Sequence, residues 1–245
     1  MSYLDINYSG NENPAISESE NIYDKKFFPN LKLSYSENII NNLNSIPILY
    51  VNEIGFKKYY SKEEVIHKVN LVAKYLRSIG VKKGDRVVGI VTNNAETLIS
   101  FLAVNSIGAV WSSCSPDFGE QAILDRFSQI EPKILFYSSN YMYGGKKFEI
   151  LEKIKNVESK LNTLEVSICI DYSQKDKSFI DEKLNFFEEN NRELSELSFE
   201  RCQFNDPMYI LYSSGTTGKP KCIVHNTGGP LIQHLKEQQL HCEIC

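Results

Sequence analysis

Apolar positions alternate between helical and strand spacing through the middle of the chain. Residues 61–80, SKEEVIHKVNLVAKYLRSIG, begin with a capping box of Ser61 and Glu64 and end at a glycine. Their apolar residues recur every three or four positions and so share one face of a helix: Val65, Val69, Val72 and Leu76. This spacing predicts an amphipathic helix that packs against a core.

Short β-branched runs and further helical segments follow this helix in alternation. Strands are predicted over residues 86–92, 109–113, 133–137 and 166–170, and helices over residues 95–107, 119–130 and 148–161. Strands that are apolar on both faces and separated by helices are typical of a parallel sheet covered by helices on both sides. The sequence therefore predicts an α/β fold, mainly parallel sheets flanked by helices.

The last third of the chain changes in character. Residues 173–206 are highly charged, with apolar residues at helical spacing, which indicates a surface helix and a linker. Strands are then predicted over residues 208–212 and 221–225, and a helix from residue 229. The predicted organisation is a disordered extension over 1–26, a first α/β subdomain over 27–172, a charged helix and linker over 173–206, and the start of a second subdomain over 207–245.

Composition and charge exclude several classes of protein. The net charge of −4 gives no broad basic surface, so nucleic acid is not an expected partner. No window approaches the roughly 20 apolar residues that span a bilayer, and the N-terminus lacks the basic and apolar segments of a signal peptide. We therefore expect no membrane partner and a cytoplasmic (cytosolic) location.

The 6 cysteines lack the density of a small disulfide scaffold, so we expect them to be reduced. Cys242 and Cys245 lie near three histidines, which suggests zinc as an alternative. The chain has no second CxxC and the histidines lack zinc-finger spacing, so no metal site is predicted.

Residues 213–221, SSGTTGKPK, carry the most specific chemistry of the chain. Gly215 and Gly218 let successive N–H groups turn inward and form an anion-binding nest. The hydroxyls of Ser213, Ser214, Thr216 and Thr217 add donors, and Lys219 and Lys221 add charge that phosphate oxygens attract. A flexible hairpin between two strands is the alternative, but it explains only the glycines and the proline. The loop therefore predicts a polyphosphate ligand.

This loop is not the common P-loop. That motif has four residues between its glycines and a Ser or Thr after its lysine. Here two residues separate Gly215 from Gly218, and Pro220 follows Lys219. A kinase or GTPase of the P-loop class is therefore not expected.

YSSGTTGKPK resembles the signature loop of the adenylate-forming superfamily of acyl-CoA synthetases at every fixed position. The resemblance implies that residues 214–218 embrace the β- and γ-phosphates of ATP and that Lys221 contributes charge. Lys219 occupies a variable position of the pattern. The fold that the resemblance implies is part of the large N-terminal domain of the adenylate-forming fold.

Five further segments resemble acetoacetyl-CoA synthetases more than general acetyl-CoA synthetases. The segments are FFPNLKLSYSENII, GVKKGDRVVGIVTN, SIGAVWSSCSPDFG, LDRFSQIEPKILF and KCIVHNTGGPLIQHLKEQQLHCEI. Phe27 and Pro230 depart mildly from the family's pattern. The resemblance implies an ATP-dependent acid–thiol ligase that uses Mg²⁺: acetoacetate is first converted to an acyl adenylate, with release of pyrophosphate, and then transferred to coenzyme A, with release of AMP.

Residues 142–147, MYGGKK, lie where related acetyl-CoA enzymes place basic residues near the phosphates of CoA. Lys146 and Lys147 are therefore candidates for CoA binding, with an ordinary exposed turn as the alternative.

Trp111 is interpreted as a core residue, although it could also approach the acyl pocket. His225 is interpreted as a strand-end histidine without a catalytic role.

Ligases of this family are much longer than 245 residues and contain an adenine-binding segment, a ribose-binding aspartate and a catalytic lysine. None of these is recognised here, so we expect the chain to be an N-terminal portion that is inactive alone, and we assign no catalytic residue. Two alternatives stay open: a ligase for another short acid such as acetate or propionate, and a non-catalytic nucleotide-binding fragment that needs a partner.

Overall fold

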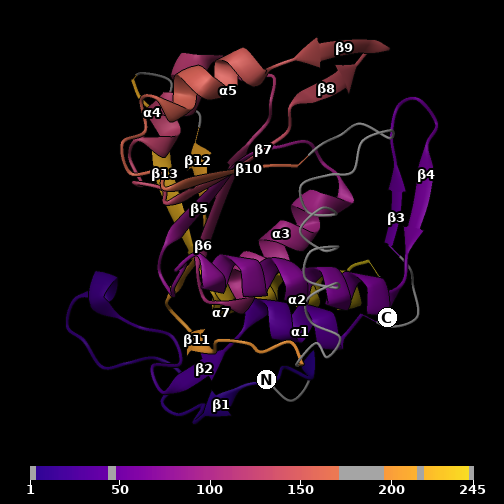
Figure 1. Cartoon of the computed structure of the whole chain (residues 1–245). Coiled ribbons are helices and arrows are strands. Elements are labelled where there is room, and N and C mark those ends of the chain that lie inside the picture. Colours follow the sequence, from indigo (N-terminus) through magenta and orange to yellow (C-terminus); the bar gives the residue numbers. More distant parts are fainter. Residues whose placement is uncertain (1–3, 44–47, 171–195, 214–217, 243–245) are drawn as a thin grey trace.

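The structure is a computed structural model that describes residues 4–43, 48–170, 196–213 and 218–242 (Figure 1). Its centre is a 6-stranded sheet with the order β10-β7-β5-β6-β12-β13, counted over these residues. The strands are β5 (Arg86–Ile90), β6 (Val110–Cys114), β7 (Ile134–Tyr137), β10 (Val166–Cys169), β12 (Pro207–Ser213) and β13 (Lys221–Asn226). All neighbours pair in parallel except β13, which is antiparallel to β12 at the edge. The predicted α/β class with a mainly parallel sheet is confirmed.

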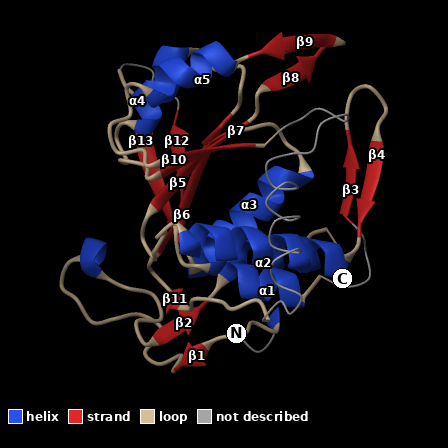
Figure 2. Ribbon diagram, viewed as in Figure 1, coloured by secondary structure: helices blue, strands red, loops and turns tan. Residues whose placement is uncertain are grey.

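Helices cover both faces of the sheet (Figure 2). One side carries α1 (Tyr35–Asn41), α2 (Lys62–Ser78) and α3 (Ala95–Ser106), and the other carries α4 (Glu120–Phe127) and α5 (Leu151–Glu158). Successive strand residues enter different cores because side chains alternate across a strand: Val87 packs with the α2 and α3 residues, whereas Val88 packs with those of α4 and α5. Burial on both faces explains why the sequence of these strands is continuously apolar.

Side-chain caps begin helices α2 and α3, and the cap of α2 is the predicted one. The Oγ of Ser61 accepts a hydrogen bond from the N–H of Glu64 at 3.1 Å, and Gly80 follows the helix with φ +83°. The Oδ1 of Asn94 likewise accepts from the N–H of Thr97 at 2.8 Å and starts α3. These side chains satisfy backbone donors that the first turn of a helix leaves free.

One predicted helix begins later than the sequence indicated. The helix expected from residue 148 starts at Leu151, because Phe148 belongs to a hairpin of β8 (Asn140–Tyr143) and β9 (Lys146–Glu149). Gly144 and Gly145 form its turn with φ of 59° and 75°. Two consecutive positive φ values define the tight turn that glycine permits in a two-residue hairpin.

The N-terminal region differs from the disorder expected over residues 1–26. Ile6 is buried, and strand β1 (Ser9–Gly10) pairs with β2 (Leu31–Leu33), which in turn pairs with β11 (Cys202–Gln203). Buried Ile6, the pairing of β1 with β2, and two hydrogen bonds between the backbone of Asn7 and the side chain of Asn38 hold this segment to the rest of the domain. Composition hides such an arrangement because the neighbouring side chains are almost all polar.

Other elements complete the described fold. They are the short helix η2 (Ile22–Asp24), the hairpin of β3 (Ile48–Val51) and β4 (Lys57–Tyr60), and the helix α7 (Gly228–Leu240). Of the predicted charged helix and linker over residues 173–206, residues 173–195 lie outside the described residues. Within the described ranges, no helix is long and apolar enough to cross a membrane.

The buried Tyr35 is expected to make the folded domain less stable at alkaline pH. Its hydroxyl lies 3.0 Å from Nδ1 of His234, and burial, followed by the neighbouring Tyr209, raises the pKa of Tyr35 to about 12. A tyrosine in the unfolded chain has a pKa of about 10, so the unfolded state ionises first and stability falls as the pH rises from about 10 to about 12. Between about pH 9 and pH 11 the wild type should lose about 1 kcal/mol more unfolding free energy than Tyr35→Phe. Urea unfolding of both proteins checks this, and equal losses would contradict it.

Candidate active site

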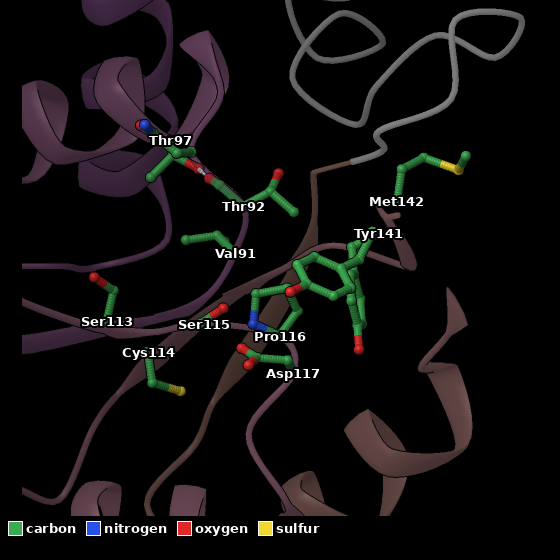
Figure 3. A pocket seen from close by; sticks show the side chains of 12 residues that line it. Val91, Thr92, Thr97, Ser113, Cys114, Ser115, Pro116, Asp117, Tyr141 and Met142 are labelled. Atoms are coloured by element: carbon green, nitrogen blue, oxygen red, sulfur yellow. Dashed lines mark hydrogen bonds between the residues drawn. The ribbon is translucent and has the colours of Figure 1, made fainter. Parts of the chain in front are cut away.

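A pocket of about 820 Å³ opens at the carboxyl ends of β5 and β6 (Figure 3). Its walls are residues 91–93 and Thr97 after β5, residues 113–117 at the end of β6, and residues 141–143 of β8. Open parallel sheets bind ligands at this edge because the loops that follow the strands converge there. The pocket is therefore the first candidate site for a small molecule.

Polar groups of several kinds face the pocket. Figure 3 shows the hydroxyls of Ser113 and Ser115, the carboxylate of Asp117 and the ring of Tyr141 among the side chains that line the pocket. Burial raises the pKa of Cys114 to about 12, and the nearby Arg126 opposes this shift only in part. The Cys114 thiol therefore stays protonated at neutral pH, which argues against a nucleophilic role.

Lys153 holds the loop that forms one wall of the pocket. Its Nζ donates hydrogen bonds to the carbonyl oxygens of Pro116 at 2.5 Å and Phe118 at 2.9 Å. Burial lowers the pKa of Lys153, while Cys114 and Asp117 oppose this shift. The guanidinium of Arg126 lies 4.8 Å from the ring centroid of Phe118 and supports the loop from α4.

The predicted phosphate loop joins β12 to β13. The antiparallel register pairs Ser213 with Lys221, so the two ends of the loop lie side by side. Gly218 has φ +105°, a conformation that favours glycine, and Lys219 and Lys221 are exposed. Ser214, Gly215, Thr216 and Thr217 lie outside the described residues.

Residues in α4 and just after it form hydrogen bonds with both ends of this loop. Gln129 Nε2, just past the helix, donates to the carbonyl oxygen of Pro220 at 2.9 Å, and the hydroxyl of Tyr212 donates to the carbonyl oxygen of Arg126 at 3.3 Å. Because β12 is parallel to β6, the loop leaves the sheet at the same edge as the pocket. The structure thus brings the two candidate regions to one edge of the sheet.

Lys146 and Lys147 lie on the exposed strand β9. The hairpin register pairs them with Tyr143 and Met142, which line the pocket. Lys147 also forms an ion pair with Glu149 at 2.7 Å. The turn of this hairpin is fastened by Glu53, whose carboxylate accepts hydrogen bonds from the N–H groups of Gly144 and Gly145 at 3.1 Å.

Other residues that the sequence singled out lie in the core or on strands. Trp111 is buried against Phe101 and Phe136, so its interpretation as a core residue is confirmed. The ring of His225 stacks on Tyr209 with centroids 4.6 Å apart. No group of three or more His, Cys, Asp or Glu side chains that could hold a metal ion occurs in the part of the chain that the structure describes.

Sequence reasoning missed the pocket and the role of Lys153. Asp117 lines the pocket, although no motif in the sequence assigns it a role. Lys153 lies in a segment for which the sequence predicts only a helix, over residues 148–161. The available signal was the run SPDFG after a predicted buried strand, because loops at the carboxyl ends of parallel strands build ligand sites.

Comparisons with known proteins agree with this geometry. A family model described as AMP-binding enzyme matches residues 48–243. The chain belongs to this AMP-binding enzyme family.

Within this family, the chain is similar to several acetoacetyl-CoA synthetases. The chain is 41% identical to an acetoacetyl-CoA synthetase of Mus musculus over 96% of its own length, and 36% identical to one of Rhizobium meliloti (strain 1021) over 93%. It superimposes on the structure of an acetoacetyl-CoA synthetase from Streptomyces lividans with a TM-score of 0.87 and 32% identity, over 99% of this chain and 38% of that one. The resemblance inferred from the sequence is confirmed. The chain spans only 37% and 36% of the length of the two curated relatives.

Proposed function

We propose that this chain is part of an acetoacetyl-CoA synthetase, which activates acetoacetate with ATP and transfers it to coenzyme A. The observation that carries the proposal is the loop SSGTTGKPK between β12 and β13, in a chain similar over nearly its whole length to enzymes of that name. A cytosolic location and the division into two subdomains belong to the same proposal.

The phosphate loop is proposed to bind the β- and γ-phosphates of ATP. Residues 213–218 supply hydroxyls and backbone N–H groups, and Lys219 and Lys221 supply positive charge. The pairing of Ser213 with Lys221 and the bond from Gln129 to Pro220 support this role, because they fix both ends of the loop. Mg²⁺ would arrive on the ATP phosphates as part of the substrate.

The reaction then follows from the chemistry of its reactants. A carboxylate oxygen of acetoacetate attacks the α-phosphorus of ATP, the bond from that phosphorus to the bridging oxygen breaks, and pyrophosphate leaves. Positive charge and N–H donors on the loop stabilise the charge that develops on pyrophosphate. The thiolate of CoA next attacks the acyl carbon, and AMP leaves. None of the described residues is assigned a catalytic role.

The pocket beside β8 is proposed to receive CoA, with Lys146 and Lys147 near its phosphates. The hairpin register that places these lysines next to pocket residues supports this assignment. Replacing both lysines by alanine should raise the Kd of CoA about tenfold, since charge-assisted hydrogen bonds to phosphate are lost. Isothermal titration measures the change.

Dephospho-CoA separates this role from a general loss of binding. If the lysines contact the 3′-phosphate, the double substitution should leave the Kd of dephospho-CoA almost unchanged. Lys155→Ala, an exposed lysine on α5, is the matched control and should affect neither ligand. Equal weakening of both ligands would show that the lysines do not contact that phosphate.

The proposed function as a whole is tested by pyrophosphate release from the complete protein that contains this chain. With ATP and CoA present, acetoacetate should support faster release than acetate or propionate at equal concentration. Faster release with acetate or propionate would instead favour a ligase for another short acid.

A further inference from the structure

Lys153 is the one lysine in the described residues whose Nζ bonds two backbone carbonyls of a loop that lines the pocket. It lies 37 and 35 residues along the chain from Pro116 and Phe118, the residues that accept its hydrogen bonds. The contact therefore joins α5 to the loop after β6, two parts of the chain that local sequence does not hold together.

The helix that carries Lys153 is a firm support for this contact. Its neighbour Ile154 and the nearby Val157 are buried in the core formed with α4 and the sheet. Core side chains are closely packed and fix the position of the helix. The ammonium group is therefore held from one side by a packed helix and bonds to the loop on the other.

Few other hydrogen bonds hold the loop at the residues that line the pocket. Ser115, Pro116 and Asp117 line the pocket, and the backbone hydrogen bond within this loop runs from the N–H of Phe118 to the carbonyl oxygen of Ser115 at 3.2 Å. Arg126 packs on the ring of Phe118 but makes its hydrogen bond to Ala122 within its own helix. Loops with few backbone bonds open at low cost in free energy.

We propose that Lys153 is a positioning residue that fixes this wall of the pocket in the geometry that receives CoA. It does not line the pocket, so it acts through the carbonyl groups of Pro116 and Phe118 rather than on the ligand. The inference rests on the proposed function for the identity of the ligand, but the contact to the loop stands on its own geometry. Without Lys153, the loop must be ordered when the ligand binds, and this ordering weakens binding.

The experiment compares Lys153→Met with Lys155→Met in the same protein. Both substitutions remove a lysine from α5, but only Lys153 contacts the loop, since Lys155 is exposed. Lys153→Met should raise the Kd of CoA about tenfold, which corresponds to about 1.4 kcal/mol of lost binding free energy. Hydrogen exchange of the amides at residues 117–119 should become faster in this variant, while Lys155→Met should match the wild type in both measurements.

A conservative variant separates positioning from general stability. Lys153→Arg retains a charged donor and should recover part of the lost CoA affinity and of the exchange protection. Should Lys153→Met fail to melt cooperatively, Lys153→Gln replaces it. Unchanged CoA affinity in the folded variant overturns the proposal, and unchanged loop exchange would show that Lys153 does not hold the loop.

The two proposals fail in different ways. If the wild-type protein does not bind CoA, the proposed ligand is wrong, and the proposal that Lys153 prepares this wall for CoA is wrong with it. The hydrogen-exchange result still decides whether Lys153 holds the loop. If wild-type CoA binding is normal and Lys153→Met binds equally well, the proposed function stands and the positioning role is excluded.

Discussion

Lys221→Ala is expected to slow acetoacetate-dependent adenylation about 100-fold, the usual effect of removing one group that stabilises charge in the transition state. Lys221 is the first residue of β13 and pairs with Ser213 across the mouth of the phosphate loop, with its side chain exposed. Its ammonium can therefore reach a phosphate held by the loop without contributing to the core. Exchange of labelled pyrophosphate into ATP measures this step directly.

Two companion variants define what the Lys221 result means. Lys219→Ala should slow exchange less, because Lys219 occupies the variable position of the motif, and Lys155→Ala should have no effect. The thermal unfolding midpoint of Lys221→Ala should stay near that of the wild type, because an exposed edge-strand side chain contributes little to stability. An unchanged exchange rate would remove Lys221 from the ATP site.

Gly228→Ala is expected to give the largest loss of stability, about 3 kcal/mol, through overpacking of a full core. Gly228 is the first residue of α7, and a Cβ at this position would lie 2.2 Å from Cδ2 and Cε2 of Phe204. The Phe204 ring is buried and packs on Phe28 with centroids 5.0 Å apart, so it has little room to move. Urea unfolding of the variant measures the loss.

A smaller side chain at position 204 tests the cause of this loss. Phe204→Leu alone should destabilise by about 1 kcal/mol, because it leaves part of the ring's volume empty. Combined with Gly228→Ala, it should remove a large part of the clash, so the double variant should be more stable than Gly228→Ala alone. If Gly228→Ala costs the same free energy in both backgrounds, contact with Phe204 is not the reason.

The regular part of the fold was predictable because local signals and burial agree there. The strand at Arg86–Ile90 is apolar on both faces and is covered on both faces by helices. The helix that follows Ser61 has a cap and an apolar face that the structure uses as expected. Where one pattern satisfies both local preference and packing, sequence alone determines the element.

The differences arise where a few residues override the local composition. Gly144 and Gly145 bend residues 140–149 into a hairpin, whereas their neighbours alone favoured the start of a helix at residue 148. Ile6 attaches a polar segment that composition assigned to disorder. Both cases depend on one or two residues, a pair of glycines in one and an isoleucine in the other, which an average over a window cannot detect.

One part of the candidate site could be recognised from the sequence, and the other part could not. The phosphate loop was recognisable because its glycines, hydroxyls and lysines occur together in nine residues. The pocket was not, because residues 91–93, 113–117 and 141–143 meet only when the strands are placed in a sheet. Lys153 could not be found from sequence for the same reason: its two acceptors are backbone carbonyls, which carry no residue-type signal.

Detection of the acyl adenylate itself tests directly whether the protein activates acetoacetate. The complete protein that contains this chain is incubated with ATP, Mg²⁺ and an equal mixture of acetoacetate, acetate and propionate, without CoA, and the adenylates formed are identified by mass spectrometry. For an acetoacetyl-CoA synthetase, acetoacetyl-AMP is expected as the main product, with a much smaller amount in Lys221→Ala. Acetyl-AMP or propionyl-AMP as the main product, or no adenylate with any of the three acids, would contradict it.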